Sequence, residues 1–272
     1  MSSRMLAIVL STLLAIALPL FSAATQAADP ATDLLKLHQL RLAAQKTLGD
    51  FYMFNGMEGD QRYARMIDES LTEVNTQLNA LTEMPGEGSK ALRSQLDQMW
   101  KGYQIDLNNL TSALKTQGFT DLQPIADLAA RNQQLMGLSQ ELYTKIQQES
   151  SYSVPPLTQR SREQSLLMQA IAVDYASRSA SIGGTFIGGA EARPIEELVS
   201  EFSSKMTALE KEPKNSPQLK QSWSGVSTKW RYIEKSLINY NENTVPFLVS
   251  KYSSTIIQGI EQISSQYAAA NL

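Results

Sequence analysis

The chain has 272 residues, of which 42% are hydrophobic and 19% charged, with no cysteine, one histidine and a formal net charge of −3. The lack of cysteine excludes disulfides, thiolate metal sites, a cysteine nucleophile and the lipidated cysteine of a lipoprotein. A single histidine excludes a metal site built on several histidines, and mild acidity without a basic block argues against nucleic-acid binding.

The first 27 residues are typical of an export signal. Arg4 precedes an uncharged apolar run over residues 5–21, and small residues follow up to Ala27. This order predicts a signal peptide over residues 1–27, with cleavage after Ala27 or Ala24. The apolar run is about 17 residues long, at the lower limit for spanning a bilayer, so an uncleaved anchor in the inner membrane is the alternative. We therefore expect a periplasmic protein.

Prolines divide the rest of the chain into eight segments with helical periodicity. Because proline interrupts a helix interior, the intervals between prolines bound the elements. Within them apolar residues alternate steps of three and four, as at Ile67, Leu71, Val74 and Leu78, which is the spacing of a helix with one buried face. Sustained strand-like alternation is absent. The expected fold class is all-α, with helices over 32–56, 61–83, 89–116, 122–150, 158–186, 194–211, 217–242 and 246–269.

The second half of the chain repeats the first. The segment 95–102, Gln-Leu-Asp-Gln-Met-Trp-Lys-Gly, recurs at 218–225 as Gln-Leu-Lys-Gln-Ser-Trp-Ser-Gly. Each copy contains four amphipathic helices, which suffice to close a bundle. We therefore predict two tandem antiparallel four-helix bundles, unit 1 over residues 28–152 and unit 2 over residues 153–272. Whether the two stack end to end or share one long bundle stays open at this point.

The first expected helix carries a charged group on its apolar face. Arg41 occupies a heptad position that normally holds an apolar residue, His38 and Gln45 project from the same face, and Lys46 follows one position round. A guanidinium at a helix seam is costly to bury unless it is paired. Its planar fork of donors also suits carboxylate and oxyanion ligands.

Three interpretations of Arg41 are open from the sequence. The side chain reaches solvent, or it binds a small anion, or it forms an internal salt bridge. The acidic residues considered as partners in that salt bridge are Asp68, Asp106 and Asp127.

The stretch Leu-Arg-Leu-Ala-Ala-Gln-Lys, residues 40–46, resembles the segment that opens the N-terminal sensory domain of type IV pilus chemotaxis transducers, the PilJ-type domain. The Gln-Leu-x-x-x-Trp pattern and the Leu-rich fourth helix resemble that domain too, so the resemblance covers nearly the whole mature chain as two copies. The same segment is similar to the periplasmic ligand box of nitrate/nitrite sensor kinases, where an arginine of the first helix contacts the anion across a subunit interface.

The resemblance implies a sensory domain in which Arg41 faces a small anion. Gln45 and Lys46 lie beside it, and His38 completes the candidate ligand-binding set. Unit 2 keeps Gln169 as the counterpart of Gln45, but Ser165 stands where the arginine is expected. Those relatives are membrane receptors with a cytoplasmic output module. We therefore expect any signal from this chain to pass through a partner such as a membrane sensor.

A glycine-rich stretch, Gly-Gly-Thr-Phe-Ile-Gly-Gly, occupies residues 183–189. It lacks the Gly-Lys-Ser/Thr ending of a phosphate-binding loop and follows no strand. We expect it to form a corner after the first helix of unit 2, with Phe186 and Ile187 as a contact point for another protein.

No nucleophile motif, assignable carboxylate pair or cofactor fingerprint occurs in the sequence. We therefore expect no enzyme activity, no cofactor and no metal site. The leading hypothesis is an exported sensory module that binds a small anion or modulates a membrane sensor. The alternative is a structural or protein-interaction scaffold of the cell envelope. A homodimer is compatible with either, because a heptad seam that carries a charge can face its own copy.

Overall fold

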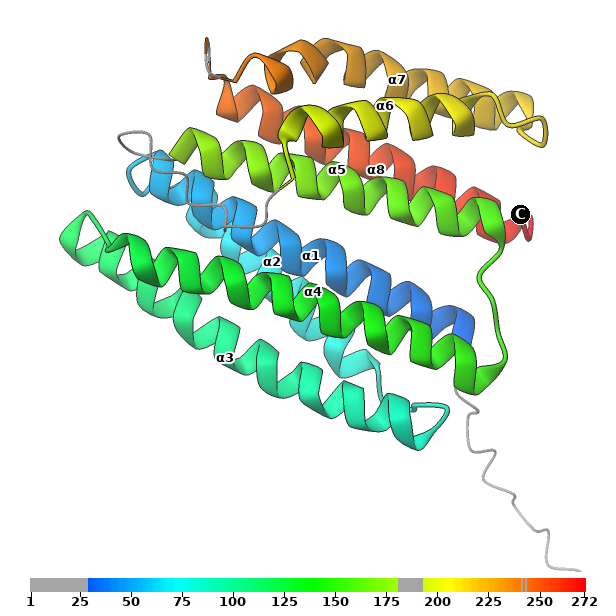
Figure 1. Ribbon diagram of the computed structural model, residues 1–272, viewed down its shortest axis with the longest axis horizontal. Helices are drawn as coiled ribbons and strands as arrows, with labels where there is room; N and C mark the ends of the chain where they lie inside the picture. The colour runs from blue at the N-terminus through cyan, green and yellow to red at the C-terminus, as the bar shows by residue number, and fades with distance from the viewer. Residues whose placement is uncertain (1–28, 181–192, 241, 243) are drawn as a thin grey trace, which may run out of the picture.

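The computed structural model describes residues 29–180, 193–240, 242 and 244–272. The described residues form eight helices and no strand, which confirms the all-α prediction (Figure 1). The expected signal peptide and the expected contact residues Phe186 and Ile187 lie outside the described residues. The helices are α1 (Pro30–Gly56), α2 (Gln61–Ala80), α3 (Glu87–Gln117), α4 (Leu122–Ser150), α5 (Pro156–Ala180), α6 (Ile195–Glu210), α7 (Pro217–Ile238) and α8 (Pro246–Ala269).

Short polar side chains and prolines set where several helices begin. The Asp29 carboxylate accepts a hydrogen bond from the Ala31 backbone N–H before α1, and the Ser216 hydroxyl accepts one from the Leu219 N–H before α7. Such caps satisfy backbone donors that have no partner within the helix. Helix α2 ends at Ala80, three residues before the expected end, because the following connection carries apolar side chains into the core and then reaches a proline.

Within each half of the chain, each helix packs against particular neighbours. In the first half of the chain α1 packs against α2 and α4, and α3 packs against α4. In the second half α5 packs against α6 and α8, and α7 packs against the same two helices. Each half has its own hydrophobic core, and only two residues of α5, Ala176 and Ala180, belong to the core of α1–α4.

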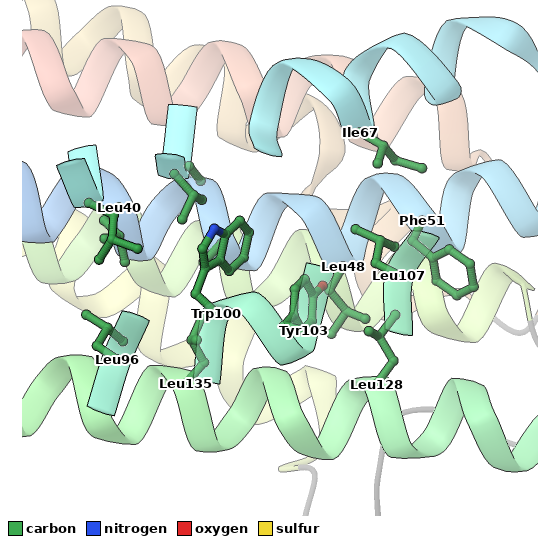
Figure 2. Packing of buried hydrophobic residues seen from close by; sticks show 14 of the residues in the cluster. Leu40, Leu48, Phe51, Ile67, Leu96, Trp100, Tyr103, Leu107, Leu128 and Leu135 are labelled. Carbon is green, nitrogen blue, oxygen red and sulfur yellow. The ribbon is translucent and has the colours of Figure 1, made fainter. Parts of the chain in front are cut away.

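Large aromatic side chains fill both cores. In the first core the rings of Trp100 and Tyr103 stack with centroids 5.4 Å apart, and Figure 2 shows both among apolar side chains of α1 and α4. The Trp100 indole N–H donates to Asn75 Oδ1 at 2.7 Å. In the second core the Trp223 indole N–H donates to the Tyr267 hydroxyl at 3.0 Å. The indole N–H groups of Trp100 and Trp223 are therefore both satisfied, as burial requires.

Helices α1 and α5 join the two halves, and we call their contact the seam. They lie side by side in the middle of the molecule (Figure 1) and run parallel, because Gly49 meets Val173 and, further along both helices, Gly56 meets Ala180. A Cβ at Gly56 would lie 3.2 Å from the Ala180 Cα, so glycine permits this close approach. The two halves thus lie beside each other and do not stack end to end.

Candidate functional site

The polar side chains expected on the first helix lie at the seam. The His38 ring is 1% exposed, and its Nε2 lies 2.9 Å from Glu261 Oε1 of α8. The Ser165 hydroxyl of α5 donates to the same carboxylate oxygen at 2.6 Å and lies 3.4 Å from His38 Nε2. Residues far apart in the chain, on α1, α5 and α8, therefore share one buried cluster.

The electrostatics of this cluster fix the charge of its two central groups. Burial lowers the pKa of His38; the Glu261 carboxylate opposes this, while the charges of Arg162 and Arg41 add to it. Burial raises the pKa of Glu261, but hydrogen bonds from His38 and Ser165 outweigh burial and leave that pKa below its usual value. At pH 7 the ring is therefore neutral and the carboxylate is ionised, so the ring N–H at Nε2 donates to Glu261.

Arg41 forms no ion pair among the described residues, although the charge of Glu163 of α5 acts to raise the pKa of its guanidinium. Its Nε atom is buried and has no hydrogen-bond partner there, and burial lowers the pKa of the guanidinium. Of the three acids that the sequence suggested, Asp106 binds Arg131 at 2.8 Å, and neither Asp68 nor Asp127 pairs with Arg41. The internal salt bridge is therefore not formed in the described structure.

Arg162 of α5 is a second buried arginine, and the sequence analysis missed it. The residue is 6% exposed, its Nε has no hydrogen-bond partner in the described part of the chain, and one terminal nitrogen donates to the Tyr143 hydroxyl at 3.4 Å. Burial raises the pKa of Tyr143, whereas the charges of Arg162 and Arg41 lower it. Both guanidinium groups therefore lie close to Tyr143 as well as to His38.

The repeat contains the signal that leads to Arg162. The pairs Gly49–Val173 and Gly56–Ala180 meet across the seam at an offset of 124 residues, and the same offset aligns Arg162 with His38. At the position of Arg41, the same offset gives Ser165. A comparison at that position alone misses Arg162, which lies one turn earlier in α5.

Gln45, Lys46 and Gln169 lie further along the seam. Gln45 Oε1 is buried without a hydrogen-bond partner among the described residues. The Lys46 ammonium is 2.6 Å from Asp50 Oδ2, so it already has a counter-ion. Lys46 and Gln169 line a cavity of about 30 Å³ between α1, α5 and α8, which is room for an ordered water and little more.

We call His38, Arg41, Tyr143, Arg162, Ser165 and Glu261 the seam cluster. Two guanidinium groups and the ionised Glu261 carboxylate lie in it among neutral hydroxyl and imidazole groups, and the charge of the exposed Glu163 acts on Arg41 from outside the cluster. No grouping of three or more metal-ligating side chains occurs in the described ranges. The cluster is suited to holding a small anion, because guanidinium groups present several N–H donors in a fixed plane.

No family model matches this chain, and searches of curated proteins and of solved structures find no match either. None of the helices among the described residues is both long and apolar enough to cross a bilayer.

Proposed function

We propose that the chain is a non-catalytic helical module that binds a small monovalent anion between Arg41 and Arg162 at the seam. The observation that carries the proposal is a pair of arginines, Arg162 buried and Arg41 partly buried, whose Nε atoms are buried without a hydrogen-bond partner and which form no ion pair in the described structure. A bound anion supplies the missing counter-charge.

The missing counter-charge has a cost in free energy. Leaving a buried charge without a partner costs about 3–5 kcal/mol in proteins where one member of a buried ion pair has been removed. Arginine stays protonated at any physiological pH, so neutralisation by proton loss does not relieve this cost. Glu261 is the one carboxylate within the cluster and Glu163 acts on Arg41 from an exposed position, so a monovalent anion adds a buried counter-charge beside the guanidinium groups.

The tandem arrangement completes the proposal. We regard α1–α4 and α5–α8 as two copies of a four-helix bundle, over residues 28–152 and 153–272, exported by the signal peptide over residues 1–27. In this view the contact between α1 and α5 takes the place of the subunit interface at which an arginine of the nitrate/nitrite sensor kinases contacts the anion. The module then works in the periplasm and modulates a membrane sensor, linked to type IV pili or chemotaxis, as its partner.

A thermal-shift screen against nitrate, nitrite, sulfate and acetate tests the ligand. An anion present at 100 times its Kd stabilises the folded protein by about 2.7 kcal/mol. We expect that stabilisation to disappear in Arg41→Gln and in Arg162→Gln. It should persist in the control Arg131→Gln, because Arg131 lies on the surface and pairs with Asp106. Equal stabilisation of all four proteins would refute the site, and no stabilisation by any anion would refute the function.

A protein-interaction scaffold is the second candidate function. Phe119, in the turn after α3, and Leu122, the first residue of α4, are 65% and 45% exposed, and neighbouring exposed apolar side chains mark contact sites. Co-purification from envelope extracts tests this role, with a Phe119→Ser, Leu122→Ser double variant and Phe186→Ser as separate probes. A partner that is lost from either variant supports the scaffold, and retention of every partner by both contradicts these contact sites.

A further inference from the structure

His38 lies in the seam cluster together with the two arginines that are proposed to hold the anion. Its ring is buried. The charged groups that act on it are Arg41 from α1, Arg162 from α5 and Glu261 from α8. From α4, Tyr143 hydrogen-bonds to Arg162 and so belongs to the same cluster. The ring has a single acidic neighbour and two basic ones.

We infer that the seam takes up one proton on His38 together with each anion, so that acid conditions tighten anion binding. This inference rests on the proposed function and adds its regulation. It assigns a role to His38 and Glu261 that differs from that of the arginines: the arginines hold the anion, and the His38–Glu261 pair holds the proton.

The physical reason is the balance of charge around the ring. Without an anion, Arg41 and Arg162 repel a proton on His38, and burial removes the water that would otherwise stabilise it. An anion between the guanidinium groups cancels much of that repulsion. The Glu261 carboxylate, 2.9 Å from Nε2, is already in place to accept a hydrogen bond from the protonated ring.

Anion binding and protonation of His38 are linked equilibria, so each changes the other by the same factor. If the anion favours protonation, protonation favours the anion by the same factor. Kd then falls by about tenfold for each unit by which pH is lowered, over the interval where the free ring is neutral and the occupied ring is protonated. Outside that interval the affinity does not depend on this group.

The experiment uses the fact that His38 is the only histidine of the chain. Histidine ring resonances of the untagged full-length protein are titrated by NMR between pH 4.5 and pH 8, without and with saturating nitrate. Nitrate is the probe because it does not itself titrate in this range. Calorimetry at pH 6, in two buffers with different heats of ionisation, counts the protons taken up with each nitrate bound. His38→Gln, whose amide can still donate to Glu261, supplies a variant without a titrating ring.

The expected result is a His38 pKa that rises when nitrate binds, proton uptake in calorimetry, and nitrate affinity in His38→Gln that is flat with pH. Binding of nitrate to the wild type with an unmoved His38 pKa overturns the proton coupling and leaves the anion site standing. Absence of binding overturns the anion site and the coupling with it. Because the NMR titration uses the wild type, a His38→Gln variant that fails to fold leaves the test intact.

Discussion

Replacing Arg162 with methionine is expected to stabilise the protein and at the same time abolish anion binding. Methionine keeps an unbranched side chain of similar length and removes a charge that is 94% buried, since Arg162 is 6% exposed. Replacing a buried ion pair or triad with apolar residues of similar volume is often neutral or stabilises the protein by about 1–4 kcal/mol. Glu261 loses the charge of Arg162 in this variant but keeps its hydrogen bonds to His38 and Ser165. The cost is the long hydrogen bond to Tyr143, worth about 0.5–1.5 kcal/mol.

Tyr143 is not left unsatisfied by this change, because its hydroxyl also donates to Gln159 Oε1 at 2.7 Å. We therefore expect a net gain of up to about 3 kcal/mol in the free energy of unfolding. Each kcal/mol corresponds to a rise in Tm of about 2–4 °C in a protein of this size.

Urea unfolding followed by tryptophan fluorescence measures this gain in both halves, because Trp100 reports on the first core and Trp223 and Trp230 on the second. The buffer must be free of small inorganic anions, which would stabilise the wild type. Arg131→Met is the matched control, and loss of its exposed pair with Asp106 costs about 0–1 kcal/mol. A loss of stability in Arg162→Met would refute the reasoning, because it would mean that the guanidinium is well partnered in solution.

Four further results follow from the structure. Without anions, the free energy of unfolding should fall as pH drops below about 6.5, by up to about 1.4 kcal/mol per pH unit, because the unfolded chain binds a proton that native His38 does not. In His38→Gln the urea midpoint should change less between pH 7 and pH 5 than it does in the wild type. Gly56→Leu should destabilise by about 1–3 kcal/mol, because its side chain meets the Ala180 backbone. Gly137→Ala, which meets nothing, should stabilise by up to about 1 kcal/mol in thermal unfolding. Trp223→Phe should cost about 0.5–1.5 kcal/mol in urea, because the Tyr267 hydroxyl loses one donor but keeps its hydrogen bond to Asn215.

The helices could be predicted from the sequence because their signals are local. Proline positions and steps of three and four apolar residues mark where each helix lies, and the all-α class follows from them. The shortened end of α2 could not be read in this way, since Leu81 and Met84 are apolar whether they continue a helix or fill the core from a connection.

The candidate site could be predicted only in part, because it depends on contacts between distant segments. Arg41 stands out from the sequence, since a charge interrupts an apolar stripe. Glu261 does not, because an acidic residue among apolar and polar neighbours is typical of an amphipathic helix, and its partner His38 is 223 positions away. The pairing of Lys46 with Asp50 was readable as an i, i+4 pair.

A crystal structure of the protein grown with bromide tests the central claim most directly, because bromide is a small monovalent anion that anomalous scattering locates. We predict an anomalous peak at the seam in contact with the guanidinium groups of both Arg41 and Arg162. Arg41 and Arg162 each paired with a carboxylate, with no bromide between them, would contradict the account.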